Sequence, residues 1–364
     1  GWISGAFFFG YIFATPFLVG LTDSYDSKKV YFISSLIGSI GLVLFALFAN
    51  GFYSALLMWS IVGAGFAGTY MPGLQILNER LDSKGKEKYV SVYTAFFGLG
   101  TAASFFILGI LKEYNLDWNY GFLIVASFQL FSGIPIILFS GPRIETKPYV
   151  RFSGILKILK SIYNVFKNKK AMPYIIGYGG HTYELFGYRA WTFACVVFLS
   201  SNYNVNLSNI FIANFLAVIG LTGIFSSIIG AQYCIGKNRP LIISYMGLIC
   251  FFGSIVTAFS FWINLYLALL FIFIYNILII MDSGSLTTGT VLNGSSEDRG
   301  SRLALHSIIG FFGGALGGPV VGLALDSFGG ENSKLSWSVG FVALGLGSLL
   351  SSYVLKKNSK FNLK

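Results

Sequence analysis

A histidine, a glutamate, a tyrosine and an arginine lie close together in the otherwise apolar stretch GYGGHTYELFGYRAWTF. Steps of three and four residues separate His181, Glu184 and Tyr188, which places their side chains on one face of a helix. Imidazole and carboxylate groups can carry protons, and the guanidinium of Arg189 suits an anionic group on a small molecule. An internal ion pair that joins two helices is the alternative role for these residues.

A metal site is a poor match to this stretch. A histidine and an acid three residues apart share a helix face, but zinc signatures need further ligands. His306 is the only other histidine of the chain. We therefore expect neither a metal ion nor another cofactor.

A second polar group occurs in IIMDSGSLTTGTV, where Asp282 is followed by several serines and threonines. We expect Asp282 to pair with Arg302 or His306 as a gate, or to exchange a proton. Capping of a helix break by the hydroxyl side chains is the alternative.

The composition determines the solvent around these groups. Of the 364 residues, 55% are hydrophobic and 11% are charged, and the mean hydropathy is +0.71. Soluble proteins carry about 25% charged residues, so this chain has too little polar surface to face water. The 44 glycines suit closely packed transmembrane helices. The sequence predicts an integral membrane protein, and its cysteines, all within apolar runs, predict packing rather than disulfides.

Crossing the hydrocarbon core takes about 20 apolar residues per helix. The sequence begins within an apolar run rather than at a methionine, so we expect a further segment before Gly1. Eleven spans are predicted, at about 1–22, 30–49, 52–77, 89–111, 119–140, 172–200, 207–235, 240–260, 262–290, 302–325 and 335–355.

The net charge of +11 comes from basic residues in alternate connections between these spans. Only Lys112, Arg189 and Lys334 of the 25 basic residues fall elsewhere. This alternation follows the positive-inside rule and places the basic loops and the C-terminus in the cytoplasm. No basic face with interleaved aromatic residues is visible, which argues against nucleic-acid binding.

The longest polar segment, residues 141–171, separates an N-terminal half at 1–140 from a C-terminal half at 172–364. Its stretch SGILKILKSIYNVFK is amphipathic and is predicted to lie on the inner membrane surface as a linker helix. A binding site for a regulatory partner is the alternative. The triplet FFG at 96–98 recurs at 311–313, which favours a structural repeat between the halves.

The loop GLTDSYDSKKV resembles the signature loop of the major facilitator superfamily. Asp23 and Lys28 occupy the acidic and the final basic positions of that pattern, whereas Ser24 and Asp26 replace its usual Arg and Gly. The stretch GAQYCIGKNRP is similar to it at the equivalent place of the second half. This resemblance implies an all-α membrane fold of two six-helix halves, with the first helix missing before Gly1.

The resemblance also implies roles for individual residues. Asp23 would lie against the start of the eleventh family helix, and with Lys28, Arg302 and His306 would form a conformational latch. A solvated loop acid is the alternative for Asp23. The fourth, seventh and tenth family helices line a central cavity, which adds Tyr70 to the candidate site of His181, Glu184, Tyr188, Arg189 and Asp282.

The function implied is secondary active transport of a small solute by alternating access, proton-coupled, with an organic or inorganic anion favoured because of Arg189. Proton-driven efflux of amphipathic compounds is the alternative within this class. A non-transporting receptor or a membrane-embedded enzyme is the alternative class, although no nucleophile with a recognisable catalytic neighbourhood occurs. The expected partners are the solute, protons and the lipid bilayer, and the expected state is a monomer in a bacterial inner membrane or another plasma-type membrane.

Overall fold

The computed structural model describes residues 2–23, 25–81, 86–142, 155–295 and 297–359. Throughout these ranges the chain forms helices and their connections, without a β-strand. Nine segments of the described chain are long and apolar enough to cross a membrane. The all-helical membrane fold predicted from composition is therefore confirmed.

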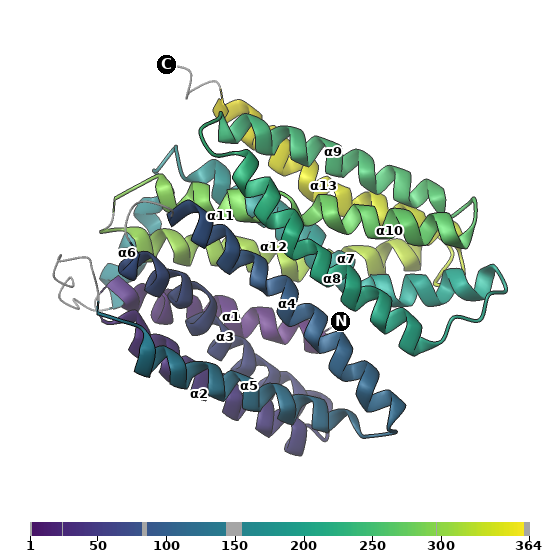
Figure 1. Cartoon of the computed structure of the whole chain (residues 1–364), viewed down its shortest axis with the longest axis horizontal. Helices are drawn as coiled ribbons and strands as arrows, with labels where there is room; N and C mark the ends of the chain where they lie inside the picture. The colour runs from purple at the N-terminus through teal and green to yellow at the C-terminus, as the bar shows by residue number, and fades with distance from the viewer. Residues whose placement is uncertain (1, 24, 82–85, 143–154, 296, 360–364) are drawn as a thin grey trace. The chain divides into compact units, whose positions relative to one another are not determined.

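The helices group into two compact units (Figure 1), each assembled from three stretches of chain. The first unit contains residues 1–90, 116–172 and 290–311, and the second contains 91–115, 173–289 and 312–364. This grouping differs from a division at the linker 141–171, because residues 91–115 join the second unit and residues 290–311 join the first.

The first unit is built on α3, which packs against α1 and α2, while α5 packs on α2. The approach of α1 to α3 is close, because a Cβ atom added to Gly10 would lie 1.9 Å from the carbonyl oxygen of Ser60. The helices of this unit are α1 (Trp2–Leu18), the short 3₁₀ helix η1 (Gly20–Asp23), α2 (Ser27–Phe48), α3 (Phe52–Arg80), α5 (Trp118–Phe139), α6 (Ile155–Val165) and the beginning of α12 (Arg299–Ser327).

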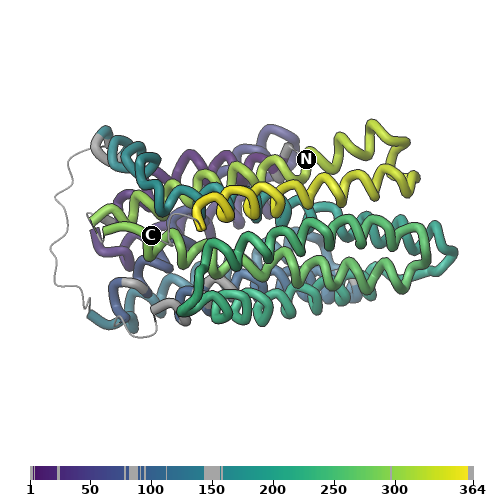
Figure 2. The backbone as a smooth tube through the Cα atoms, turned by 90° about the horizontal axis from the view of Figure 1, so that it is seen from above, coloured from purple at the N-terminus to yellow at the C-terminus, as the bar shows by residue number. Residues whose placement is uncertain are grey.

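In the second unit, α9 packs against α13 and α10, and α10 also packs against α8. Figure 2 shows α13, in yellow, doubling back from the end of α12. The helices of this unit are most of α4 (Lys86–Glu113), α7 (Met172–Asn202), α8 (Asn209–Tyr233), α9 (Arg239–Ser260), α10 (Leu265–Ile280), most of α11 (Ser283–Leu292), the remainder of α12, and α13 (Lys334–Ser359).

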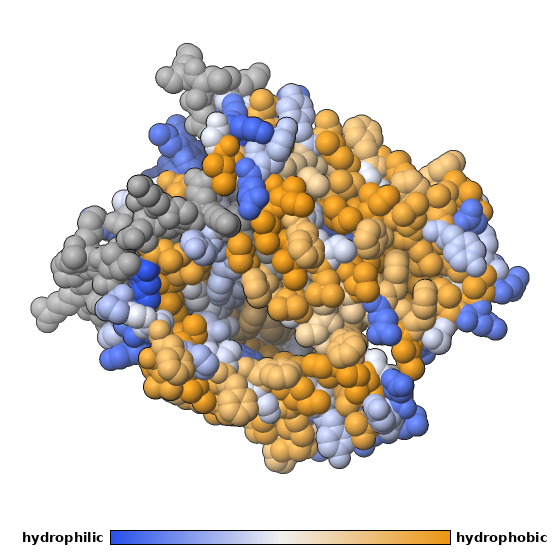
Figure 3. Space-filling model, in the orientation of Figure 1, coloured by the Kyte–Doolittle hydropathy of each residue, from blue (hydrophilic) through white to orange (hydrophobic). Residues whose placement is uncertain are grey.

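Each predicted span coincides with a helix or a pair of helices, but α4 and α7, at the spans expected at 89–111 and 172–200, are not among the nine segments apolar enough to cross a membrane. A second difference concerns a helix break. The span expected at 262–290 consists of two helices, α10 and α11, interrupted at Met281 and Asp282. The amphipathic linker helix is present as α6, although residues 143–154 of the linker lie outside the described chain. Hydrophobic side chains cover much of the visible surface over α8 and α10 (Figure 3), as expected of helices that face lipid.

Two contacts place α7 firmly in the second unit. A Cβ atom added to Gly180 would lie 2.3 Å from the carbonyl oxygen of Gly347 in α13, and one added to Gly187 would lie 2.9 Å from the carbonyl carbon of Gly317 in α12. Backbones can approach this closely only where side chains are absent, which is how small residues pack membrane helices. These contacts fix the rotation of α7 and therefore the direction of its polar side chains.

Candidate functional site

Glu184 is the single carboxylate of α7 and is buried, with 1% of its surface exposed. Its Oε1 atom accepts hydrogen bonds from the Tyr275 hydroxyl at 2.6 Å, from the Cys250 thiol at 3.4 Å and from the Ser348 hydroxyl at 3.4 Å. These donors come from α10, α9 and α13, so four helices converge on one oxygen atom. A buried polar group needs such partners, because burying it without them costs several kcal/mol.

His181 lies one helical turn before Glu184 and contacts a different acid. Its Nδ1 atom is 2.8 Å from Oδ1 of Asp282, and both residues are buried. The imidazole also stacks on the ring of Tyr178, with the centroids 5.7 Å apart. Asp282 immediately precedes α11, and its carbonyl accepts the hydrogen bond from the Leu286 amide that closes the first turn. The carboxylate therefore gains from the positive end of the α11 dipole as well as from His181.

Tyr188 extends the same face of α7 by one more turn. Its hydroxyl donates to the carbonyl of Ile272 in α10 at 2.9 Å. Its ring meets that of Tyr275 edge to face, at 5.6 Å between centroids and 83° between planes. Because Tyr275 also donates to Glu184, the single side chain of Tyr275 connects Tyr188 to the Glu184 carboxylate.

Arg189 points in another direction. It follows Glu184 by five residues, a rotation of about 140° around the helix, and its guanidinium carbon lies over the ring of Phe97 in α4, 5.0 Å from the centroid. The side chain is half-buried and lines a small cavity within the second unit. Further lining residues come from α4, α7 and α10, among them Thr101, Phe105, Tyr188, Thr192 and Asn276.

The candidate residues of the second unit thus form two neighbouring groups. One contains the buried acids with His181, and the other is the cavity beside Arg189. Tyr188 belongs to both, because it contacts Tyr275 and also lines the cavity. A group of buried acids and a cavity beside a cation consequently lie on two sides of a single helix.

The structure gives Asp282 a partner on α7 that was not among those expected. Within the described ranges its ion pair is with His181, whereas Arg302 pairs with Asp298 and also donates to the carbonyl of Val291 at 3.3 Å. His306 contacts the hydroxyl of Thr290 at 3.0 Å. Arg302 and His306 belong to the first unit and are engaged there in local contacts near the start of α12. The positions of these residues along the chain gave no indication that Asp282 would pair with His181.

The structure describes the surroundings of Lys28, an expected latch residue, but not those of the Asp23 side chain. Asp23 ends η1, but its side chain lies outside the described residues. Lys28 donates from Nζ to the carbonyl of Ser140, just past the end of α5, at 3.2 Å. Tyr70 of α3, expected to line the cavity rather than to form the latch, stacks on Phe66, with the centroids 5.8 Å apart.

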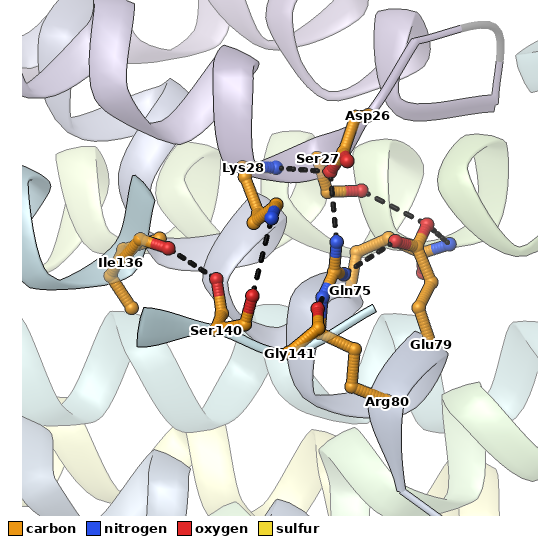
Figure 4. A network of polar contacts seen from close by, with 9 residues as sticks. All are labelled: Asp26, Ser27, Lys28, Gln75, Glu79, Arg80, Ile136, Ser140 and Gly141. Atoms are coloured by element: carbon orange, nitrogen blue, oxygen red, sulfur yellow. Dashed lines mark hydrogen bonds and ion pairs between the residues drawn. The ribbon is translucent and has the colours of Figure 1, made fainter. Parts of the chain in front are cut away.

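A polar network that the sequence did not predict surrounds the start of α2 (Figure 4). The carboxylate of Asp26 accepts from Arg80 at 3.0 Å, and a second nitrogen of Arg80 binds Glu79 at 3.0 Å. Glu79 is fully buried and also accepts from the Ser27 hydroxyl at 3.0 Å and from the Gln75 amide at 3.1 Å. The loop after η1 is therefore held to the end of α3 by an ionic network.

Arg80 carries this network onward to α5, since its Nε atom donates to the carbonyl of Gly141 at 2.9 Å. Asp26 stands where the family pattern has glycine, and that departure was the one available signal of its role. Cys250, Tyr275 and Ser348 carried little signal, because each lies in an apolar or small-residue run typical of helix packing.

Comparisons with known proteins agree with this architecture. The family model for the Major Facilitator Superfamily matches residues 1–294. A protein of Buchnera aphidicola subsp. Schizaphis graminum (strain Sg), described as an uncharacterized transporter, is 23% identical over 254 residues, which are 68% of this chain. That match spans 57% of the relative's own length.

Two similar solved structures cover almost the whole chain. The human organic anion transporter MFSD10 (TETRAN) superposes with a TM-score of 0.74 at 15% identity, over 98% of this chain and 83% of that one. The E. coli fucose:proton symporter FucP superposes with a TM-score of 0.64 at 15% identity, over 96% of this chain and 90% of that one. The chain belongs to the major facilitator superfamily, a family of membrane transporters rather than enzymes.

Proposed function

We propose that the protein is a secondary active transporter that moves a small organic or inorganic anion by alternating access and couples this movement to protons. The observation that carries the proposal is the placement of Arg189. It is a cation near the middle of α7, a predicted span, and it lies half-buried on the wall of a cavity that also presents Tyr188, Thr192 and Asn276. Ionisable groups inside a membrane normally face such a cavity or a partner because lipid does not solvate them.

The lining of the cavity supports an anionic solute. A guanidinium can donate two parallel hydrogen bonds to a carboxylate or phosphate. The Tyr188 and Thr192 hydroxyls already donate to backbone carbonyls, so toward a solute they can only accept. The side-chain amide of Asn276 donates one N–H to the Ile219 carbonyl and has a second N–H that can donate. Phe97 and Phe105 supply apolar contacts. Charge-assisted hydrogen bonds of this type contribute about 1.5–3 kcal/mol each.

The group around Glu184 supports proton coupling. The three donors to its Oε1 atom, a phenol, a thiol and an alcohol, are neutral. They stabilise the carboxylate without cancelling its charge, so addition of a proton changes the net charge of the site. Tyr275 and Tyr188 connect this carboxylate to the cavity wall through one hydrogen bond and one ring contact. A solute in the cavity can therefore influence the protonation of Glu184 by displacing Tyr188 and, through it, Tyr275.

The similar structures include an organic anion transporter and a fucose:proton symporter. At 15% identity these likenesses establish a common fold, and many transport chemistries share it. The choice of an anion accordingly rests on Arg189. Proton-driven efflux of amphipathic compounds is the second candidate, favoured by the aromatic residues beside the cavity. We further propose a monomer in a bacterial inner membrane or another plasma-type membrane, with the basic loops in the cytoplasm.

The test uses the whole protein in liposomes with a pH-sensitive dye inside. Inorganic phosphate and a panel of mono- and dicarboxylates are added outside, followed by sugars and organic cations. We expect an anion to move protons in the wild type. Arg189→Ala should raise KM for that anion by about 10- to 100-fold, the loss of one charge-assisted hydrogen bond.

Two further variants sharpen this test. Lys237→Ala is a matched control, because Lys237 also lies over an aromatic ring, Tyr233 at 3.5 Å, but outside the cavity. Glu184→Gln should retain solute exchange and lose proton movement. Normal anion transport by Arg189→Ala would remove the basis for the anion, and movement of organic cations alone would favour the efflux function.

A further inference from the structure

We propose that α6 is a membrane-surface anchor that binds anionic lipid headgroups, with its exposed apolar face inserted between them. The proposal concerns the linker helix and is independent of which solute is transported. It rests on the burial pattern of α6, on its attachment to the ends of membrane helices, and on the charges beside it.

One face of the linker helix is apolar and uncovered. Leu156, Leu159, Tyr163 and Phe166 follow one another at steps of three and four residues, so they share a face. Their exposed fractions are 83%, 42%, 64% and 51%. An amphipathic helix with such a face lies in the plane of a membrane interface when its apolar side can enter the acyl boundary.

The opposite face of α6 is docked on the protein. Ile162 and Val165 are buried, and the hydroxyl of Ser161 accepts a hydrogen bond from that of Ser301 at 2.8 Å. Just beyond α6, the side-chain amide of Asn168 donates to the carbonyl of Asn293 at 2.8 Å. Ser301 lies in the first turn of α12 and Asn293 directly follows α11.

These attachments set the depth of the helix. The segments α10–α11 and α12 are both of membrane-spanning length, so their ends lie near the boundary between hydrocarbon and headgroups. A helix fixed to those ends is held at headgroup level. Its exposed apolar face is therefore placed where a lipid surface can receive it.

The charges beside the apolar face select the kind of lipid. Lys160 and Lys167 are exposed next to it, and the ammonium of Lys167 lies 5.9 Å from the centre of the Tyr163 ring. Lys169 and Lys170 follow and are also exposed, and no acidic residue occurs between 152 and 171. A cluster of lysines around an interfacial helix is attracted to anionic headgroups rather than to zwitterionic ones.

The experiment measures the depth of α6 in vesicles containing the whole protein. An environment-sensitive fluorophore is attached through Tyr163→Cys, and in a matched control through Asn164→Cys, the adjacent exposed residue on the polar side. The native cysteines are all buried, so the introduced thiol reacts selectively. The vesicles contain phosphatidylcholine alone or phosphatidylcholine with phosphatidylglycerol, and quenchers are placed on the acyl chains or in the water.

We expect acyl-chain quenching at position 163 and aqueous quenching at position 164, with phosphatidylglycerol increasing the former. Lys160→Gln and Lys167→Gln should each reduce the effect of phosphatidylglycerol roughly fivefold at low salt. Equal aqueous quenching at both positions would overturn the proposal. An insertion that does not respond to phosphatidylglycerol would overturn its anionic-lipid part, and protection of position 163 in lipid-free detergent would instead indicate cover by protein.

Discussion

The packing of α7 offers the most direct test of how the candidate site is assembled, through the substitution Gly180→Ala. The methyl group would lie 2.3 Å from the carbonyl oxygen of Gly347, and the reciprocal substitution at Gly347 would bring a methyl group within 2.2 Å of the Gly180 carbonyl oxygen. Both contacted atoms belong to the backbone. No side chain can therefore rotate away, and relief requires movement of a whole helix.

The size of the effect follows from this distance. An ordinary contact between carbon and oxygen is longer by about 1 Å, so the two helices must separate locally by about that distance. The gap that opens between their other contacting atoms removes a quarter to a half of the dispersion energy of those contacts. Overpacking of this kind typically destabilises a protein by about 1–3 kcal/mol. The same shift would change the position of His181, the next residue, relative to Asp282, and their present distance of 2.8 Å leaves little room for change within hydrogen-bonding range.

The assay compares the free energy of unfolding in mixed micelles with that of Gly100→Ala. Gly100 also lies within a helix of the second unit, and a Cβ atom there would meet nothing within 4 Å. The control variant should match the wild type or be more stable, because alanine is the better helix former. If the two variants are equally stable, the close contact between α7 and α13 is wrong, and with it the orientation of His181 and Glu184.

Two further predictions concern charged groups. Arg80→Ala removes the cation beside Glu79, which is fully buried. Because an unpaired buried charge is unfavourable, the substitution should lower the free energy of unfolding by about 3 kcal/mol. A loss below about 1 kcal/mol in chemical denaturation would contradict the network of Figure 4. Asp282→Asn keeps a polar group near His181 but removes its ionic partner, so proton-driven uptake should fail in liposomes while solute exchange persists. Undiminished proton-driven uptake by that variant would exclude the pair from coupling.

Helix positions were predictable because they depend on properties of neighbouring residues. The span expected at 119–140 is α5, Trp118–Phe139, and the one expected at 240–260 is α9, Arg239–Ser260. Each is delimited by a polar or turn-forming stretch on both sides of an apolar run, and the length of that run alone decides whether a helix can cross the hydrocarbon core. The amphipathic spacing of α6 was equally local.

The partners of the polar residues were not predictable in this way. Cys250 resembles any packing residue of an apolar helix, yet its thiol is 3.4 Å from Glu184. Arg189 is close to Glu184 in sequence but lies over Phe97 of another helix. Helical period indicates which side chains share a face, but it does not indicate which helix lies opposite that face.

By itself, the sequence determined that this chain is a membrane protein, where its helices run, which family its signature loop resembles, and which ionisable residues lie inside the spans. Only the tertiary structure decided that Asp282 pairs with His181, and that Glu184 meets donors from three other helices while Arg189 lies over an aromatic ring of α4. The physical reason is that hydrophobic length and helical period are local quantities. The pairing of charges in a medium of low dielectric depends instead on a few ångströms of distance between helices, and close glycine contacts far apart in the sequence set that distance.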